Sequence, residues 1–379
     1  MHFNYLRLIN YRNFSDIDLK FDHNINIFIG ENAQGKTNIL EALNFIITGK
    51  SYRTNLDAQL INWNSQSCYL HASIYKKENN YKIHISLENK NNKINKNKLI
   101  KFIKINQNFK KKFQLNEEFK GVVFSPEHLQ VVKGSPALRR KFLNDQISQI
   151  YPLYYKYLLR YYRILAHRNS ILKKNYNIFE KKRDLSLWNP QLIEYGTFII
   201  LTRSKFLKKI SDLANNFQKE ITQNNEILKL KYQTNIYQQC DEKIECIKEE
   251  FLKKIKTNLD KELMIKTSII GPHRDDFIIY NNQSNIAFFG SQGQQRTAIL
   301  VLKLAELDII KERESLYPIL FLDDVMSELD EKRRYFLLNL IKNRKIQTFI
   351  TSINLNYFNK DIVNKGKIFT IKEGKSTTL

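Results

Sequence analysis

The stretch that decides the fold is INIFIGENAQGKTNIL, residues 25–40. Its first five residues, Ile25–Ile29, form a short apolar segment typical of a buried strand. The next eight, GENAQGKT, fit the pattern G-x-x-x-x-G-K-[ST] in full, and apolar residues at helical spacing follow them. A glycine-rich loop between a strand and a helix is the setting in which this motif binds phosphate. A chance glycine loop is the alternative, and the flanking strand and helix argue against it.

The loop predicts a nucleotide-binding site. Its glycines allow backbone angles that turn amide groups toward phosphate oxygens. Lys36 can reach the β- and γ-phosphates, Thr37 can place its hydroxyl on Mg²⁺, and the start of the following helix adds its dipole. The predicted binding residues are Gly30, Glu31, Asn32, Ala33, Gln34, Gly35, Lys36 and Thr37.

A second apolar segment, Ile319–Leu322, ends in the acidic pair Asp323 and Asp324. An acidic residue at the end of a strand completes many phosphate-loop sites, where it holds Mg²⁺. We expect Asp323 to bind Mg²⁺ through water, together with Thr37. Asp324 is the candidate general base, or the group that orients the attacking water. With Lys36, this pair forms the predicted catalytic set, and an ordinary acidic turn is the alternative.

A second phosphate loop is predicted at FGSQGQQR, residues 289–296, directly before an apolar helix. Ser291, Gly293 and the start of that helix can bind a phosphate group. One chain seldom needs two phosphate loops for one nucleotide, whereas in ABC-type heads such a signature closes on the nucleotide of a second subunit. The predicted trans signature is Ser291, Gln292, Gly293, Gln294 and Gln295.

The order of predicted elements is α/β, then helical, then α/β. Strands are expected at 69–75, 81–87, 99–105, 268–270 and 285–289. Helices follow Ser135-Pro136, with a break at Pro152 and a joint between two long helices around 175–190. We therefore expect an α/β ATPase head, residues 1–140 and 265–379, split in sequence by a short helical arm, residues 141–264.

The chain has 379 residues, with 62 Lys and Arg against 38 Asp and Glu, so the formal net charge is +24. Such a surplus favours a polyanionic partner, because bound phosphates release counterions. A coding bias toward Lys, Asn and Ile is an alternative source of the charge. No segment is apolar enough to cross a membrane, and the first residues do not form a signal peptide. Three cysteines without CxxC spacing argue against a zinc site and a disulfide framework. These features predict a soluble, cytoplasmic protein.

Several motifs together resemble the RecF family of bacterial recombination mediators, which are ABC-type ATPases of the SMC/Rad50 kind. The phosphate loop alone is common to many NTPases, whereas the combination is specific, and the resemblance covers essentially the whole chain. Besides GENAQGKT and SQGQQR, it rests on YRNF (11–14), FSPE (124–127), GSP (134–136), RRKFL (139–143), HRN (167–169), GPHR (271–274) and LDDVMSELD (322–330).

The resemblance implies ATP and Mg²⁺ as cofactors, an ATP-dependent homodimer and weak, DNA-stimulated ATP hydrolysis. It also implies binding to double-stranded DNA and single-strand/duplex junctions, and cooperation with RecR and RecO in loading RecA during DNA repair, replication restart and the SOS response. Two features depart from the wider ABC class. Asp324 stands where ABC transporters carry Glu, which suggests slow hydrolysis, and no switch His follows the expected strand 348–350, so no catalytic His is assigned.

Four weaker site residues come from the same analogy with SMC-like heads. Arg53, Arg12 and Asn13 are candidate phosphate or DNA contacts, and a solvated loop position is an equal alternative for Arg53. Glu127 lies where ABC heads carry their Q-loop, although a helix-capping role fits almost as well. The basic run 90–112 could grip DNA phosphates, but a solvated loop is slightly favoured for any single lysine.

Two other functions fit the sequence less well. A nuclease-linked ATPase, of the Rad50-like or OLD-like kind, would carry long coiled coils or an added acidic domain, and an arm of roughly 120 residues is too short to bring distant ends together. A transporter ATPase is disfavoured by the net charge of +24 and by the helical insertion. The preferred prediction is an ATP-dependent DNA-binding protein that does not act at a membrane.

Overall fold

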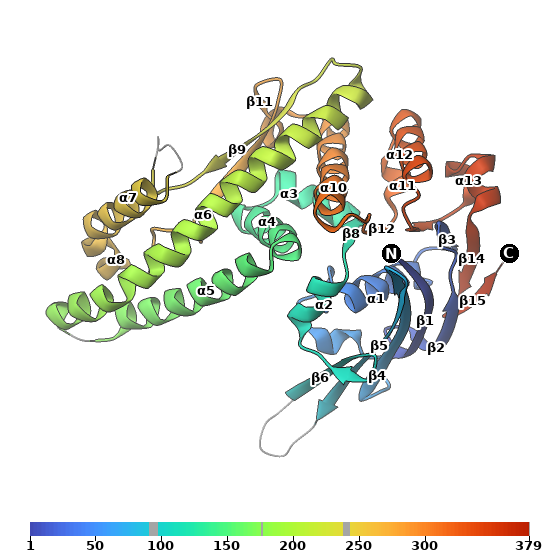
Figure 1. Cartoon of the computed structure of the whole chain (residues 1–379), viewed down its shortest axis with the longest axis horizontal. Coiled ribbons are helices and arrows are strands. Elements are labelled where there is room, and N and C mark those ends of the chain that lie inside the picture. Colours follow the sequence, from blue (N-terminus) through green and yellow to red (C-terminus); the bar gives the residue numbers. More distant parts are fainter. Residues whose placement is uncertain (91–97, 176, 238–242, 379) are drawn as a thin grey trace. The chain divides into compact units, whose positions relative to one another are not determined.

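The computed structural model describes residues 1–90, 98–175, 177–237 and 243–378. The chain divides into two compact units, drawn in Figure 1. Unit 1 comprises Met1–His128 and Lys303–Leu379, and unit 2 comprises Leu129–Leu302. The boundary between Leu302 of unit 2 and Lys303 of unit 1 falls within helix α10 (Gln292–Glu314).

These boundaries differ from the head and arm limits expected from the sequence. Strand β9 (Leu228–Gln233) lies in the expected arm, and β10 (Asp276–Asn281) lies in the expected head. The two strands pair along their whole length, which places both in unit 2. The functional division into head and arm stays a prediction.

Unit 1 contains an antiparallel sheet with the strand order β2-β1-β4-β5-β6-β7. Alternating apolar and polar residues produce it, because one face of each strand is buried and the other is exposed. Its strands confirm the expectations for 69–75, 81–87 and 99–105. The bounds are β1 (His2–Tyr11), β2 (Phe14–Lys20), β4 (Ser67–Lys76), β5 (Asn79–Lys90), β6 (Lys98–Ile105) and β7 (Asn108–Phe109).

The second sheet of unit 1 has the order β15-β14-β3-β13-β12-β8, and all its pairings are parallel except that of β15. Parallel strands carry their carboxyl ends at one edge, so the residues after β3 and β12 are placed close together. The bounds are β3 (Ile25–Ile29), β8 (Gly121–Phe124), β12 (Ile319–Leu322), β13 (Thr348–Ser352), β14 (Lys367–Lys372) and β15 (Lys375–Thr378).

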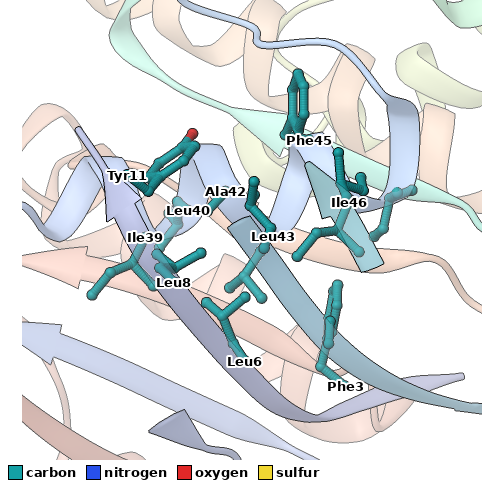
Figure 2. Packing of buried hydrophobic residues seen from close by; sticks show 14 of the residues in the cluster. Phe3, Leu6, Leu8, Tyr11, Ile39, Leu40, Ala42, Leu43, Phe45 and Ile46 are labelled. Atoms are coloured by element: carbon teal, nitrogen blue, oxygen red, sulfur yellow. The ribbon is translucent and has the colours of Figure 1, made fainter. Parts of the chain in front are cut away.

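Helix α1 (Lys36–Thr48) packs into the core of unit 1, which draws side chains from both sheets. Figure 2 shows Leu6 and Leu8 of β1 beside Ile39 and Leu43 of α1, all without solvent exposure. This packing fixes α1 in the core of unit 1, directly after the phosphate loop. Other helices of unit 1 are η1 (Asp57–Leu60), α2 (Lys112–Glu118), α11 (Val325–Glu328), α12 (Glu331–Arg344), η3 (Leu355–Tyr357) and α13 (Lys360–Lys365).

Unit 2 is mainly helical and contains a three-stranded antiparallel sheet, β11-β10-β9. Helix α4 begins where Ser135-Pro136 predicts, and Pro152 separates α4 from α5 as expected. The elements are α3 (Gln130–Lys133), α4 (Pro136–Ile150), α5 (Pro152–Lys173), α6 (Ile178–Thr222), α7 (Ile244–Thr257), α8 (Leu259–Ile265), β11 (Ser284–Asn285) and α9 (Ile286–Phe289).

Several sequence-based expectations in unit 2 were wrong. The joint expected around 175–190 is shorter, because Pro190 lies inside the 45-residue helix α6. A proline inside a helix costs about 3 kcal/mol, and the long apolar face of α6 packed on α5 outweighs this. Residues 268–270 form no strand. Residues 286–289 form α9 because Asn285 caps it by accepting a hydrogen bond from the Ala287 amide.

Two remaining expectations concern cysteines and membranes. Cys68 is a buried free thiol, whereas Cys246 is disulfide-bonded. The sequence argues against a disulfide framework, and one disulfide-bonded cysteine among the described residues does not form such a framework. Within the described ranges, no helix combines the length and the apolar character needed to span a membrane.

Candidate nucleotide-binding site

The phosphate loop connects β3 to α1 and adopts a backbone that only certain residues tolerate. Gly30 and Gly35 have φ values of 152° and 110°, and a Cβ on Gly30 would lie 2.4 Å from the Ile371 carbonyl oxygen. Ala33 also lies in the left-handed region, with φ at 64°. Because α1 begins at Lys36, the amides of its first turn have no partner within the helix. The loop therefore offers donors to an anion, as the motif predicts.

Lys36 is folded back over this loop. Its Nζ donates hydrogen bonds to the carbonyl oxygens of Gly30, at 2.6 Å, and Glu31, at 2.7 Å. Burial lowers the pKa of Lys36, and the carboxylates of Asp324 and Asp323 oppose this effect. The ammonium group is thus held in the loop by acceptors that a phosphate could replace.

Asp323 follows β12 and joins the acidic strand to the phosphate loop. Its Oδ1 accepts hydrogen bonds from Thr37 Oγ1, at 2.8 Å, and Thr351 Oγ1, at 3.0 Å. Its Oδ2 accepts one from the Tyr52 hydroxyl, at 2.9 Å. Thr37 and Asp323 are 286 positions apart in the chain, and the structure brings them into direct contact. A hydroxyl beside a carboxylate is a donor set that suits Mg²⁺ bound with substrate phosphates.

Asp324 adopts a left-handed backbone conformation, with φ at 52°. Its amide donates to Thr351 Oγ1, at 2.8 Å, and its carboxylate accepts from Ser327 Oγ, at 3.2 Å. Burial raises the pKa of Asp324, while the Ser327 hydrogen bond lowers it. A partly desolvated carboxylate with a raised pKa is better able to accept a proton.

Arg12 lies in a buried network that the sequence did not indicate. Its Nε and Nη2 donate to the two carboxylate oxygens of Glu41 in α1, at 2.9 and 2.7 Å. The Glu41 side chain is fully buried and also accepts from Ser51 Oγ, at 2.5 Å. Glu41 lies among apolar residues of α1, so no motif could reveal it. The bidentate pair ties Arg12 to the helix that carries the phosphate loop.

Asn13 and Arg53 support the same region. Asn13 Nδ2 donates to the Gln34 carbonyl oxygen, at 3.1 Å, and its Oδ1 accepts from Asn38, at 2.8 Å. Arg53 donates to Asn38 Oδ1, at 2.9 Å, and lies 3.8 Å from a Glu41 carboxylate oxygen. The structure thus places Arg12, Asn13 and Arg53 beside the phosphate loop. Their contact with phosphate or DNA stays a prediction.

Glu127 is the fourth of the weaker site residues predicted from the sequence. It belongs to the short helix η2 (Pro126–Leu129) after β8, and its side chain is exposed. The structure neither adds to nor removes its predicted Q-loop role. The basic run is described only in part, since Lys93 and Lys96 lie outside the described residues.

The predicted signature forms the start of α10, within unit 2. Ser291 and Gln294 cap this helix reciprocally: Ser291 Oγ accepts from the Gln294 amide, at 3.2 Å, and Gln294 Oε1 accepts from the Ser291 amide, at 2.9 Å. Gln295 is buried and donates to the Gly290 carbonyl oxygen, at 3.0 Å. Ser291 and Gln292 are exposed at the end of a 23-residue helix, and Gly293 is half-buried. The helix end is therefore open to an anion, as the sequence predicts.

Comparison with known proteins identifies the family. The family model described as "RecF/RecN/SMC N terminal domain" matches residues 2–377. A protein of Clostridium kluyveri named DNA replication and repair protein RecF is 42% identical over 376 residues, covering 99% of both chains. This chain belongs to the RecF family. A RecF of Natranaerobius thermophilus is 40% identical and covers 99% of this chain and 97% of its own.

Solved structures agree with this assignment. A structure described as the recombination mediator protein RecF with ATP in the RecFOR pathway has a TM-score of 0.88 at 32% identity, covering 100% of this chain and 97% of the other. An SMC head bound to the C-terminal winged-helix domain of ScpA has a TM-score of 0.56 at 14% identity, covering 100% and 97%. The ABC-type, SMC-like α/β head fold expected from the sequence is confirmed, as is the resemblance to RecF.

Proposed function

We propose that this chain is an ATP-dependent DNA-binding protein of DNA replication and repair. In this proposal it dimerises on ATP, binds duplex DNA near single-strand gaps and helps to load RecA, acting with RecR and RecO. The observation that carries the proposal is the direct contact between Thr37 and Asp323. This contact brings the phosphate loop and the acidic strand together, which supports one shared nucleotide site, and the RecF relatives support its biological setting.

The loop residues account for ATP binding. The amides of the loop and of the first turn of α1 would bind the phosphates, and Lys36 would exchange its carbonyl partners for phosphate oxygens. Thr37 and Asp323 would hold Mg²⁺, which neutralises charge on the phosphates when bound. The Thr37–Asp323 hydrogen bond supports this role, since both oxygens already point to one place.

Asp324 is the proposed base, or the group that orients water for hydrolysis. Its raised pKa favours proton acceptance, and the Thr351 and Ser327 hydrogen bonds fix its position. An aspartate is one methylene shorter than the glutamate of ABC transporters, so the attacking water is held less closely. We therefore propose slow hydrolysis, stimulated by DNA, that acts as a switch.

The signature residues at the start of α10 would form the contact between two copies of the chain. Ser291 and Gly293 at the exposed start of α10 would bind the γ-phosphate of ATP held by a second copy of the chain, and the reverse contact would form across a two-fold axis. The family likeness to RecF described with ATP supports this arrangement. ATP would then join the two copies, and loss of the γ-phosphate would release them.

DNA binding is supported by the net charge of +24. If the proposal holds, affinity for duplex DNA falls steeply with salt, with a log–log slope of about 0.9 per phosphate neutralised. The description of a similar structure as part of the RecFOR pathway supports RecR and RecO as partners.

The test is equilibrium binding of labelled ATP and of a gapped duplex, measured for wild type and three lysine variants. Lys36→Ala should abolish ATP binding and ATP-dependent DNA binding. Lys36→Arg should still bind ATP but lose hydrolysis, because the guanidinium group is larger than the ammonium group and displaces the reacting phosphate. Lys20→Ala, at an exposed position of β2, is the matched control and should behave as wild type. Normal ATP binding by Lys36→Ala would show that the phosphate loop is not the site, and ATPase stimulation by a membrane partner instead of DNA would favour a transporter.

A further inference from the structure

The antiparallel sheet of unit 1 has an outer face that the nucleotide site does not use. Its inner face is buried in the core, through residues such as Leu70, Ile85 and Ile103. The alternating side chains of β4, β5 and β6 therefore point outward, away from the core. This outer face carries aromatic and basic groups among the polar residues expected of a solvated sheet.

Basic side chains form one row across four strands. Arg7 of β1 pairs in register with His71 of β4, which pairs with His84 of β5, which pairs with Lys104 of β6. The Nδ1 atoms of the two histidines are hydrogen-bonded to each other, with ring centroids 4.7 Å apart. The row ends at Phe109 of β7, where Lys104 Nζ lies 4.5 Å from the ring centroid.

Aromatic side chains flank this row. In the neighbouring register, Tyr69 of β4 is opposite Ser86 of β5, which is opposite Phe102 of β6. Tyr69 is 36% exposed and Phe102 is 42% exposed, which is unusual for two large rings on one sheet face. The face is hollowed into a pocket of about 370 Å³, lined mainly by Tyr69, His71, His84, Ser86, Phe102 and Lys104.

We propose that this outer face, Tyr69, His71, His84, Phe102 and Lys104, binds single-stranded DNA. Unpaired bases stack on Tyr69 and Phe102, and the strand's phosphates lie along the basic row. The inference rests on the proposed function, since it assigns the single-stranded part of a gapped substrate to a surface of its own. Nothing in the nucleotide site requires these residues.

Charge and chemistry favour this occupant. Among the described residues of β4, β5 and β6, the charged side chains on the outer face are Lys82, Lys104 and Glu88. Arg7 of β1 is paired with Asp16 of the edge strand β2, where Asp18 also lies. Free positive charge is therefore concentrated at Lys82 and Lys104 around the histidine pair, which suits a polyanion better than an apolar protein partner. Aromatic rings on an open sheet stack unpaired bases whatever their sequence, whereas the bases of a duplex are hidden in the stack.

The histidine pair gives the site a dependence on pH. Burial lowers the pKa of both histidines, aided by His84 and Arg7 at His71, and by Lys104 and Lys82 at His84. Both rings are therefore neutral at neutral pH without a ligand. A bound phosphate favours the protonated rings, so affinity for a single strand rises as pH falls through the histidine range.

The experiment measures the binding of fluorescent oligothymidylate of about 15 nucleotides, a length that covers one such platform, by anisotropy. Tyr69→Ala and Phe102→Ala should each weaken binding about five-fold or more, the loss expected for one stacked base. Tyr69→Phe keeps the ring and should retain wild-type affinity. Trp63→Ala, which removes a 98% exposed ring outside the sheet, is the matched control and should change nothing.

Two further readouts locate the strand. A strand with 5-iodouracil should cross-link to peptides of β4 and β6, and His84→Gln should flatten the rise in affinity between pH 8 and pH 6. The proposal is overturned if wild type does not bind the strand, if the alanine variants bind it as wild type does, or if cross-links map elsewhere. It is also overturned if the alanine variants lose duplex binding to the same extent as single-strand binding. A change in the solution mass of these variants without DNA would also overturn it, because it would indicate that the face forms a contact between copies.

The same variants separate this proposal from the proposed function. ATP binding and the ATP-dependent mass are measured on each, and neither should change, because all these residues lie outside the nucleotide site. If wild type fails to bind ATP or gapped duplex, the proposed function fails, whatever the single-strand result. If ATP and duplex binding are intact and the strand does not bind this face, only the present inference fails.

Discussion

Replacement of Arg12 by alanine should destabilise the helix that carries the phosphate loop. The change removes both guanidinium hydrogen bonds to Glu41, whose side chain has no solvent exposure. Breaking a buried ion pair by removing one partner costs about 3–5 kcal/mol, because the remaining charge is left uncompensated. Ser51 still donates to Glu41, and Arg53 lies 3.8 Å away. These groups place the loss at the lower end, about 3 kcal/mol.

Hydrogen exchange of the α1 amides measures this loss directly, because local exchange rates report the free energy of opening. A loss of about 3 kcal/mol should speed exchange in α1 about 150-fold. Arg12→Ala combined with Glu41→Gln should recover much of the protection, because the uncompensated charge is gone.

Arg7→Ala is the matched control for this experiment. Arg7 makes the same bidentate contact with Asp16, at 3.1 and 2.8 Å, but both side chains are about half exposed. Water replaces the lost partner, so exchange in α1 should stay close to wild type. Equal effects of Arg12→Ala and Arg7→Ala, or no effect of either, would refute the reasoning that burial makes the Arg12 pair important.

Three further predictions concern single side chains. Gly35→Ala should abolish binding of a fluorescent ATP analogue, because a Cβ at φ 110° would lie 2.7 Å from Asn13 Nδ2; normal binding would contradict the loop geometry. Tyr52→Phe removes a hydroxyl that donates to Asp323. If Asp323 holds Mg²⁺ as proposed, half-maximal ATP binding should then need less Mg²⁺, and an unchanged requirement would contradict this competition. Burial lowers the pKa of His273 to about 4, from 6.5. Its contribution to stability is therefore present above pH 6.5 and lost as pH falls toward 4. In His273→Gln, the free energy of unfolding measured with urea should depend less on pH over that range. A pH dependence equal to that of wild type would contradict this prediction.

The phosphate loop could be predicted from the sequence because its eight residues are contiguous. The strand before it, the helix after it and the two glycines with positive φ all follow from local pattern. Asp323 was also within reach, since an acidic residue after an apolar strand is a local signal. Its contacts with Tyr52 and Thr351 were not, because these residues are brought together only by the parallel sheet.

Glu41 and Pro190 show where pattern reasoning fails. Glu41 occurs among apolar residues of α1 and looks like an ordinary helical glutamate, yet it is fully buried against Arg12. Pro190 carries a strong local signal to end a helix, but tertiary packing of α6 outweighs it. The pairing of β9 with β10 likewise joins segments that the sequence assigns to different domains. In each case the decisive partner is distant in the chain.

The most direct test of the account is the mass of the protein in solution, measured by light scattering with Mg²⁺ and either ATP or ADP. The mass should be about twice the 45.2 kDa chain mass with ATP, and that of a single chain with ADP. Ser291→Arg should bind ATP normally but remain a single chain, because the arginine side chain would occupy the position at the start of α10 where the γ-phosphate is proposed to bind. Ser291→Thr keeps the capping oxygen and should still dimerise. A Ser291→Arg variant that doubles its mass with ATP would contradict the composite site formed by two copies, even if Lys36 proved essential for binding.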